Sequence, residues 1–449
     1  MKTIHELAAE LAAGKTSSRA LVEQALARIA DPAGEGVRVF LHAHADAALL
    51  QATASDQLRS RGIVPSPLAG IPVSVKDLFD IAGEVTRAGS RVRDDAAPAV
   101  ADAAVVSRLR QAGAIIVGRT NTVEFAFSGL GLNPHYGTPR NPWDRATGRI
   151  PGGSSCGAAV SVADGMAAMG LGTDTGGSVR IPAALCGLTG FKPTARRIPK
   201  EGTFPLSATL DSIGPIAQSA SCCALIDSIL AGLEPQVPAP LPLAGLRLGV
   251  VKDYVLDGLD AAVAQAFEQA LARLSKAGAR ISEVCFAALE RLPHINRNGG
   301  MVLPEAYAIH RELIAARRAG YDPRVASRVL HGAEVRAADY IEVQNERAAM
   351  IADSARIAAP FDAWLMPTVV MVAPAIAPLE ADDRLYNQTD YVILRNPSVV
   401  NFLDGCALTI PCHAPGAGPV GLSVVGQGGE DRRLLAIGLA VEGALRISH

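Results

Sequence analysis

The sequence predicts an α/β fold in which helices cover a largely buried sheet. Short apolar runs with β-branched residues, at Ile71–Val75, Ala114–Val117 and Leu246–Val251, alternate along the chain with runs of helical periodicity. A strand that is buried on both faces has an almost continuous apolar sequence, and such strands are typically covered by the helices between them. With 449 residues, of which 49% are hydrophobic, the chain is long enough to bury a large core.

The segments before and between these strands are expected to be helical. Residues 1–60 are predicted to be mostly helical, because Thr3 and Glu6 form a capping-box pattern and Thr16–Ser18 precede an apolar run of helical spacing. Between the first two strands we expect a helix at Ala101–Ala112. After the third strand we expect a helix from about Asp260 to Gly278.

Two later segments differ in composition from the rest. Residues 292–358 are richer in Arg, Ala and Glu and are predicted to be helical. Leu233–Leu243 is the one Pro-rich connector, and it fits either a domain boundary or a surface crossing within one domain. The second interpretation is favoured because the segment is short.

The overall composition excludes several classes of protein. The 42 cationic and 44 acidic side chains leave a net charge of −2 without a basic run, which argues against a nucleic-acid partner. No apolar stretch is long enough for a membrane span, and Glu6 and Glu10 lie where a signal peptide would be apolar. The seven cysteines include no C-x-x-C pair, so we expect reduced thiols in a cytoplasmic protein.

The segment from Arg149 to Thr194 carries the chemistry-bearing pattern. Its glycines flank serines in two clusters, Gly152–Gly157 and Gly172–Ser178. The small residues of Ala158–Ala168 between the clusters predict a helix that packs closely on its neighbours, so the two serine-bearing turns can meet in space. Taken alone, a Gly- and Ser-rich stretch forms a loop more often than a catalytic site.

Two common motifs do not account for this segment. No Lys follows the glycines, so the pattern is not a phosphate-binding P-loop. Gly153–Gly157 matches G-x-S-x-G with Ser155 at its centre, but the preceding Asn141–Ile150 is polar and turn-like where a nucleophile elbow needs a strand. A hydrolase triad of that type also needs a histidine, and no histidine of the chain has distinctive surroundings.

The whole segment resembles the amidase signature family, a family of Ser–Ser–Lys amide hydrolases. The serine cluster at Gly152–Gly157 and the sequence GTDTGGSVRIPAALCGLTGFKPT at Gly172–Thr194 match the family pattern almost without a break. Gly70–Asp77, Gly113–Ala126 and Pro411–Val425 are further similar segments, so the resemblance covers nearly the full chain and is weakest over residues 245–360.

The resemblance implies a three-layer α/β/α fold around a large mixed sheet. It places residues 1–449 in a single domain. Within it, residues 1–60 are an N-terminal helical appendage, residues 70–220 the signature core, and residues 245–360 a more variable helical part.

The resemblance also implies the roles of individual residues. Ser178 takes the place of the nucleophile, Lys76 that of the base, and Ser154, after a cis peptide bond from Gly153, that of the bridge between them. The implied oxyanion and substrate-binding groups are the backbone N–H groups of Thr175, Gly176 and Gly177, with that of Ser178. The implied supporting residues are Ser155 beside the lysine and Asp174 and Arg180 around the nucleophile loop. The family needs neither a metal nor a cofactor.

Lys76 is the most plausible base on physical grounds as well. A serine hydroxyl needs a base, and arginine, which supplies all but seven of the 42 cations, cannot release its proton. Burial in the apolar Ile71–Val75 run is expected to lower the pKa of Lys76. The alternative is a strand-end lysine paired with Asp77 or Asp80. Lys192 is also in the signature but is expected in a turn beside Pro193.

A cysteine next to the paired serines is the main departure from the family. Cys156 stands where many relatives carry Gly or Ser, but no histidine is placed to activate it, so we predict that it only packs. The remaining cysteines are predicted to be small buried apolar residues.

The function implied by the resemblance is hydrolysis of a small carboxamide to carboxylate and ammonia through an acyl-enzyme. The alternative is the glutaminase component of a tRNA-dependent amidotransferase, which passes ammonia to partner subunits and leaves tRNA binding to them. The short chain and the apolar Val369–Val372 favour the first and suggest an aliphatic or aryl acyl group. A ring-amide or urea-type hydrolase with a small partner remains open, as does a homodimer. A catalytically inactive binding protein on the same scaffold would lack at least one of Lys76, Ser154 and Ser178, and all three are present.

Overall fold

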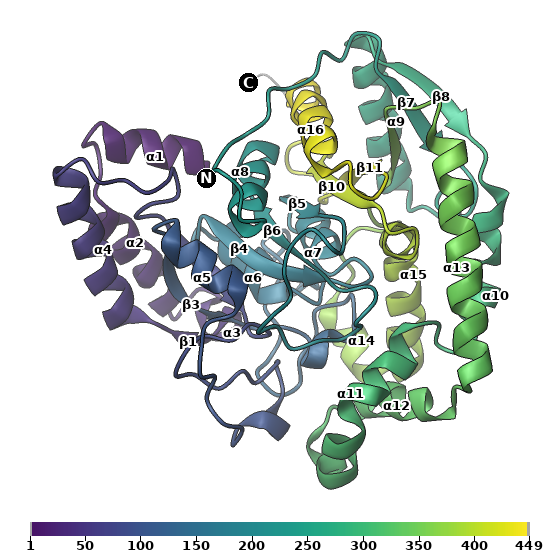
Figure 1. The fold of residues 1–449 in the computed structure, drawn as a ribbon, viewed down its shortest axis with the longest axis horizontal. Coiled ribbons are helices and arrows are strands. Elements are labelled where there is room, and N and C mark those ends of the chain that lie inside the picture. Colours follow the sequence, from purple (N-terminus) through teal and green to yellow (C-terminus); the bar gives the residue numbers. More distant parts are fainter. Residues whose placement is uncertain (1, 447–449) are drawn as a thin grey trace.

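One sheet runs through the whole molecule, and the computed structural model describes residues 2–446 around it (Figure 1). Its eleven strands follow the order β1-β3-β2-β4-β6-β5-β10-β11-β9-β7-β8. The strands are β1 (Phe40–Ala43), β2 (Pro72–Lys76), β3 (Ile115–Thr120), β4 (Met169–Asp174), β5 (Thr189–Lys192), β6 (Ser212–Ala217), β7 (Arg247–Val251), β8 (Arg280–Val284), β9 (Ala363–Pro367), β10 (Cys406–Pro411) and β11 (Gly421–Gly426).

The sheet is mixed, as expected. β2 pairs in parallel with β3 and β4, and β7 pairs in parallel with β8 and β9. The strands between these two groups pair antiparallel. The carboxyl ends of β2, β3 and β4 therefore lie at one edge of the sheet.

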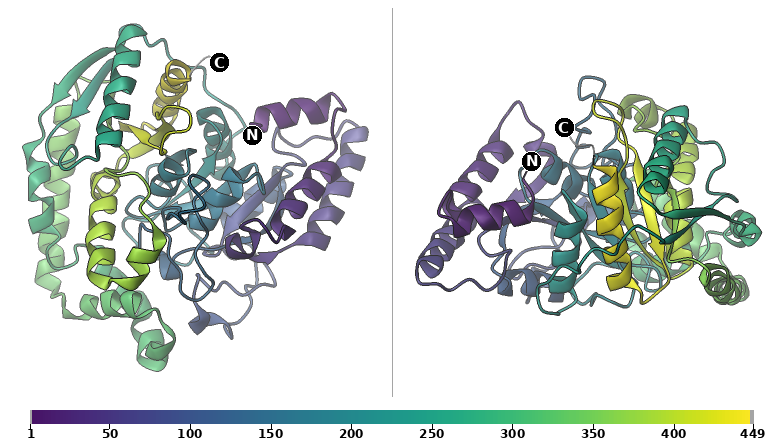
Figure 2. Two further views of the ribbon diagram at one scale, coloured as in Figure 1. Left: turned by 180° about the vertical axis from the view of Figure 1, so that it is seen from behind. Right: turned by 90° about the horizontal axis from the view of Figure 1, so that it is seen from above.

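Helices cover both faces of the sheet, which gives the predicted three layers (Figure 2). Neighbouring residues of a strand point to opposite faces: Ile116 packs in the cluster that includes α5, α8, α9 and α16, whereas Val117 packs with α2, α4 and α6. The α-helices of the described residues are α1 (Ile4–Ala12), α2 (Ser18–Ala30), α3 (Gly36–Val39), α4 (Ala45–Ser60), α5 (Ala104–Gln111), α6 (Cys156–Ala163), α7 (Arg180–Leu185), α8 (Ala220–Leu230), α9 (Ala261–Lys276), α10 (Leu292–Ile295), α11 (Val302–Arg317), α12 (Pro323–His331), α13 (Ala337–Ala358), α14 (Ile376–Ala381), α15 (Asp383–Phe402) and α16 (Asp431–Leu445).

Most of the predicted elements are present with small shifts of their ends, but the helix expected at Ala158–Ala168 is α6, which ends at Ala163. The three predicted strands are β2, β3 and β7, and the two helices expected around them are α5 and α9. The capping box of α1 is also confirmed, since the Thr3 hydroxyl accepts from the Glu6 N–H and the Glu6 carboxylate accepts from the Thr3 N–H at 2.6 Å. The sequence did not show β1, a four-residue strand that joins the edge of the sheet against β3. A strand this short is too brief to display an alternating pattern.

The Pro-rich segment Leu233–Leu243 connects α8 to β7 and lies on the main core. Val237, Leu241 and Leu243 pack against the cluster that contains residues of both β2 and β7. The Leu241 N–H also donates to the Ala436 carbonyl in α16. The segment thus crosses the surface of a continuous core.

Neither a membrane span nor a metal cluster is found in residues 2–446. No helix there combines the length and the apolar content needed to cross a bilayer. The same residues contain no group of three or more His, Cys, Asp or Glu side chains that could hold a metal ion.

Close packing between α6 and β4 brings the two serine-bearing segments together. A Cβ atom on Gly170 of β4 would lie 2.7 Å from the Ala158 carbonyl oxygen of α6. On the other side of α6, a Cβ on Gly157 would lie 2.7 Å from the backbone of Asn121. Glycine at these two positions lets the helix lie directly on the strand ends.

We expect Gly170→Ala to lower the free energy of unfolding by about 1–3 kcal/mol, because the added methyl group overpacks a contact with backbone. The measurement is the midpoint of denaturant unfolding. The control is Gly443→Ala in α16, where a Cβ meets nothing within 4 Å and helix propensity should leave stability unchanged or slightly raised. Equal midpoints for wild type and Gly170→Ala would show that the α6–β4 contact is not tight.

Candidate active site

The implied catalytic residues lie where β2, β4 and α6 meet. Lys76 is the last residue of β2, and Ser154 and Ser155 come directly before α6. Ser178 lies in the loop between β4 and α7. Because β2 and β4 are neighbouring parallel strands, the lysine and the loop after β4 lie at the same edge of the sheet.

The Lys76 amine is fully buried and bonded only to hydroxyl groups. Its Nζ lies 2.7 Å from Ser154 Oγ, 2.9 Å from Ser155 Oγ and 2.8 Å from Thr173 Oγ1. No ion pair reaches it among the described residues. Burial disfavours the charged form and lowers the pKa of Lys76 to about 7, so that a large share of the amine is neutral at neutral pH.

The alternative partners of Lys76 are engaged elsewhere. Asp77 binds the buried Arg119 guanidinium at 2.8 Å, and Asp80 accepts from the Thr86 hydroxyl at 2.6 Å. The interpretation of Lys76 as an ordinary strand-end lysine in an ion pair is therefore wrong. Sequence reasoning missed Thr173 as its third hydroxyl partner, although this threonine belongs to the GTDTGG segment.

The two serine clusters are joined through the backbone. The Ser155 N–H donates to the Ser178 carbonyl at 3.2 Å, and the Gly153–Ser154 peptide bond is cis, as expected. Within residues 2–446, the Ser178 hydroxyl makes no hydrogen bond with Ser154. The structure thus brings Lys76, Ser154 and Ser155 into direct contact and places Ser178 on the adjoining loop.

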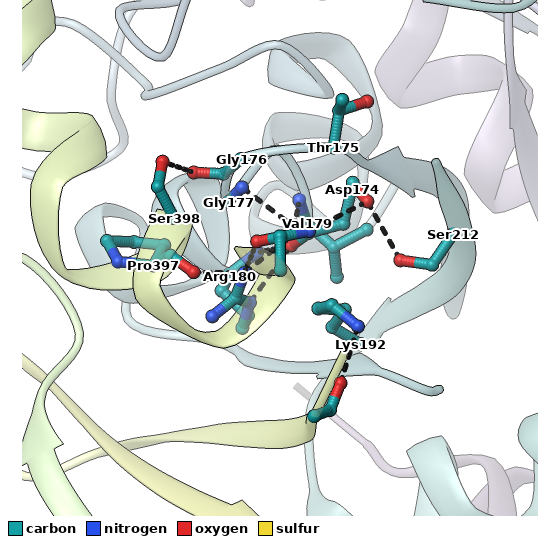
Figure 3. Close-up of polar contacts among 12 residues, drawn as sticks. Asp174, Thr175, Gly176, Gly177, Val179, Arg180, Lys192, Ser212, Pro397 and Ser398 are labelled. Carbon is teal, nitrogen blue, oxygen red and sulfur yellow. Dashed lines mark hydrogen bonds and ion pairs between the residues drawn. The ribbon is translucent and has the colours of Figure 1, made fainter. Parts of the chain in front are cut away.

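The Asp174 carboxylate organises the loop that carries Ser178 (Figure 3). It accepts the Gly177 N–H at 2.9 Å and binds the Arg180 guanidinium through two bonds of 2.9 and 3.0 Å. Burial alone would raise the pKa of Asp174, but the charge and hydrogen bonds of Arg180 outweigh it and lower this pKa to about 2. Both residues are fully buried, and both hold the loop.

This arrangement changes the expected set of oxyanion donors. The Gly177 N–H already has an acceptor in Asp174. The N–H groups of Thr175, Gly176 and Ser178 have no acceptor in the described part of the chain. Gly177 instead supplies the turn itself, because its φ of +127° lies in a region that side chains rarely allow.

Helix α15 holds the same loop from the other side, and sequence reasoning missed it. The Arg180 guanidinium donates to the Pro397 carbonyl at 2.9 Å (Figure 3). It also donates to Asn401 Oδ1 at 2.6 Å. Asn401 Nδ2 in turn donates to Asp174 Oδ1, and the Ser398 hydroxyl donates to the Gly176 carbonyl at 3.2 Å. More than two hundred residues of sequence separate the loop of Ser178 from its partners in α15. The one local feature that distinguishes this part of α15 is a proline inside the helix, Pro397.

The structure corrects the expectation for Lys192 and gives a role to Asp211, which the sequence did not single out. Lys192 is not in a turn but ends β5, fully buried, where it donates to the Pro193 and Gly405 carbonyls. Burial lowers its pKa to about 8. Asp211 accepts a hydrogen bond from the Thr175 hydroxyl at 2.5 Å and so fixes this side chain at the start of the loop that carries Ser178.

A cavity of about 560 Å³ opens at Ser178. Much of its wall is apolar and comes from four parts of the chain, with Phe127, Leu206, Leu210, Met301, Leu394 and Phe402 among the lining residues. The expected acyl-binding run lies elsewhere, because Val369 is buried in a separate core cluster with Ile150 and Leu185, and Val370 is buried as well. Most of the residues that line the cavity lie after residue 245 instead, many of them in α15.

The cysteine next to the paired serines is a packing residue, as predicted. Cys156 is fully buried, its Sγ lies 3.5 Å from the Asn121 carbonyl, and burial raises its pKa to about 12. A thiol with such a pKa is not a nucleophile at neutral pH. All seven cysteines are free thiols, and one expectation is wrong, since Cys285 is exposed and not buried.

Comparisons with known proteins agree on the family. The family model for "Amidase" matches residues 20–435. A 2-amino-5-chloromuconic acid deaminase from Comamonas testosteroni is 38% identical, over 89% of this chain and 86% of its own. A glutamyl-tRNA(Gln) amidotransferase component from Chloroflexus aggregans is 34% identical, over 96% of this chain and 94% of its own.

The fold is equally similar to that of a solved amidase. That structure superimposes with a TM-score of 0.88 at 33% identity and covers 98% of this chain and 99% of its own. Sequence and fold thus agree over almost the entire length. The chain belongs to the amidase family, and the protein is an amide hydrolase.

Proposed function

We propose that the protein hydrolyses a small carboxamide to a carboxylate and ammonia, with Ser178 as nucleophile and Lys76 as base. The observation that carries this proposal is the Lys76 amine, which is fully buried and bonded to three hydroxyl groups without a carboxylate. Burial of a lysine without a counter-charge is costly for folding, and it supplies a neutral amine that can accept a proton near neutral pH.

The proton route follows from the contacts of Lys76. The neutral amine takes the hydroxyl proton of Ser154, and Ser154 takes that of Ser178 as Ser178 Oγ bonds to the amide carbon. This step requires the Ser178 hydroxyl to turn toward Ser154, with which it makes no hydrogen bond among the described residues. The protonated lysine then returns the proton to the departing nitrogen, which leaves as ammonia, and water hydrolyses the acyl-enzyme by the same route.

The oxyanion of the tetrahedral intermediate lies against backbone N–H groups at Ser178. The N–H groups of Gly176 and Ser178 have no acceptor among the described residues and lie nearest to the proposed nucleophile in the sequence. The free N–H group of Thr175 is the next along the loop. Asp174, through Gly177, keeps these groups in a fixed orientation. Preorganised donors of this kind each contribute about 10²–10³ in rate.

The second candidate function is that of the glutaminase component of a tRNA-dependent amidotransferase, which is supported by the 34% identity to the protein from Chloroflexus aggregans. We favour a free-standing amidase, because the relative with 38% identity is a deaminase whose name gives a small organic acid. The apolar part of the cavity wall also suits an acyl chain better than it suits glutamine. A homodimer and a cytoplasmic location stay predictions.

Ser178→Ala should abolish ammonia release from every amide that the wild type hydrolyses, because the acyl-enzyme can no longer form. The measurement is ammonia release by the purified chain from aliphatic, aryl and dicarboxylic amides and from glutamine. Cys156→Ala is the control and should keep near-normal activity. Release from glutamine alone would favour the amidotransferase function, and an active Ser178→Ala would place the nucleophile elsewhere.

The pH dependence of kcat/KM should report the pKa of the proposed base, Lys76. Because the amine must be neutral to accept a proton, kcat/KM is expected to rise with pH and to level off above about 7, the pKa of Lys76. Lys76→Ala should lose most of the activity and this rising limb. A wild-type profile that stays flat from pH 5 to 9 would contradict the role of Lys76.

The neutral lysine also predicts a pH-dependent stability. Between about pH 7 and its unfolded pKa near 10.5, Lys76 binds a proton in the unfolded chain but not in the native one, so stability should increase as pH rises through this window. In Lys76→Met this increase should be smaller, by an amount on the order of a few kcal/mol. Urea unfolding of both proteins at pH 7 and pH 10 measures the difference, and equal increases would mean that Lys76 is charged in the native state.

A further inference from the structure

The charged residues that line the cavity at Ser178 are unbalanced. Three arginines, Arg297, Arg328 and Arg395, face one acidic residue, Asp390. Asp390 is engaged by Arg328 at 2.7 Å. Arg297 is 40% exposed and has Glu342 at 3.7 Å. Arg395 is thus the one cavity arginine that has no carboxylate within ion-pair distance in residues 2–446.

Arg395 lies on the helix that contacts the nucleophile loop. Its neighbour Leu394 packs against Gly176, and Ser398, less than one turn later in α15, donates to the Gly176 carbonyl. A single stretch of α15 therefore connects the nucleophile loop to the Arg395 guanidinium. The cavity joins them, since Ser178, Leu394 and Arg395 all line it.

The Arg395 guanidinium is held in place by groups that leave its charge uncompensated. It donates to the Asp257 carbonyl at 2.6 Å and to Asn396 Oδ1 at 3.2 Å, and both are neutral acceptors. Its Nη1 has no protein partner in the described chain. The side chain is only partly exposed, and burial lowers its pKa even though nearby Tyr254 and Asp257 act in the opposite direction.

Tyr254 gives this end of the cavity a fixed shape. Its ring lies under the guanidinium, with 5.5 Å between Arg395 Cζ and the ring centroid. Its backbone has a φ of +68°, which is unusual for a bulky side chain and persists where the surroundings impose it. A guanidinium that is stacked on an aromatic ring and has a free Nη1 group is well suited to bind an anion.

We propose that Arg395 binds a carboxylate of the substrate, so that the preferred substrates are amides that carry a carboxylate at the end remote from the scissile bond. The inference rests on the proposed function and adds the substrate class. The carboxylate supplies the counter-charge that Arg395 lacks, while the apolar wall between Arg395 and Ser178 contacts the carbon chain. The free Nη1 group can donate to a carboxylate oxygen in a charge-assisted hydrogen bond.

The test compares acidic and neutral amides of equal length. Monoamides from succinamate to suberamate are assayed against butanamide to octanamide, in which a methyl group replaces the carboxylate. We expect the wild type to prefer an acidic amide. Arg395→Met should lower kcat/KM for that amide about 10- to 100-fold and leave the neutral amide within about twofold. Arg395→Lys should recover part of the loss.

The matched control is Lys252→Met, which removes a cation from the same β7–α9 loop as Tyr254 but outside the cavity. It should behave like the wild type. If Arg395→Met lowers the rates on acidic and neutral amides equally, or if the wild type shows no preference for acidic amides, the inference is wrong.

A binding measurement separates this inference from the proposed function. Calorimetry with the dicarboxylates from succinate to suberate needs no hydrolysis, and Arg395→Met should weaken the Kd of the best ligand about 10- to 100-fold. Arg395-dependent binding without any amide hydrolysis would retain the anion site and reject the proposed function. Binding that is absent, or unchanged in Arg395→Met, would reject the anion site.

Discussion

The structure depends on a lysine amine that is buried without a counter-charge. Three hydroxyl groups surround Lys76 Nζ, and they come from the start of α6 and the end of β4. To place them there, β4 must lie next to β2, and α6 must lie directly on β4, which glycine at position 170 allows. The hydroxyl groups that surround the uncharged Lys76 amine therefore require both this strand order and the close contact between α6 and β4.

Arg180, a buried basic side chain close after Ser178, is stabilised in the opposite manner. Arg180 keeps its charge, and Asp174, Asn401 and the Pro397 carbonyl neutralise or solvate it on the sides they contact. The difference suits the chemistry of the two side chains, because arginine retains its proton under all ordinary conditions and lysine does not. The charged pair fixes the loop, and the uncharged amine fits the proton transfer that we propose for Lys76.

The local parts of the site could be predicted from the sequence, and the long-range parts could not. Lys76 in an apolar strand and the two serine clusters are visible within short segments, and so is the family pattern that implies the cis bond at Ser154. The contacts of Ser398 and Asn401 depend on how α15 docks, which no short segment encodes. The cavity wall was misplaced at Val369–Val372 for the same reason, since apolar character alone does not tell a pocket wall from a core. β1 was missed because four residues carry too little periodicity.

Helix α15 serves two purposes at once. Ser398 and Asn401 hold the nucleophile loop, and Leu394 and Arg395, less than two turns away, line the cavity. The remaining cavity wall comes largely from segments that do not touch Lys76 or its hydroxyl partners. Substrate range can therefore diverge among descendants of this chain through the segments around residues 206 and 301 without a change at Lys76 or its hydroxyl partners. Changes in α15, by contrast, alter selectivity and turnover together, which makes this helix the most informative target for directed evolution.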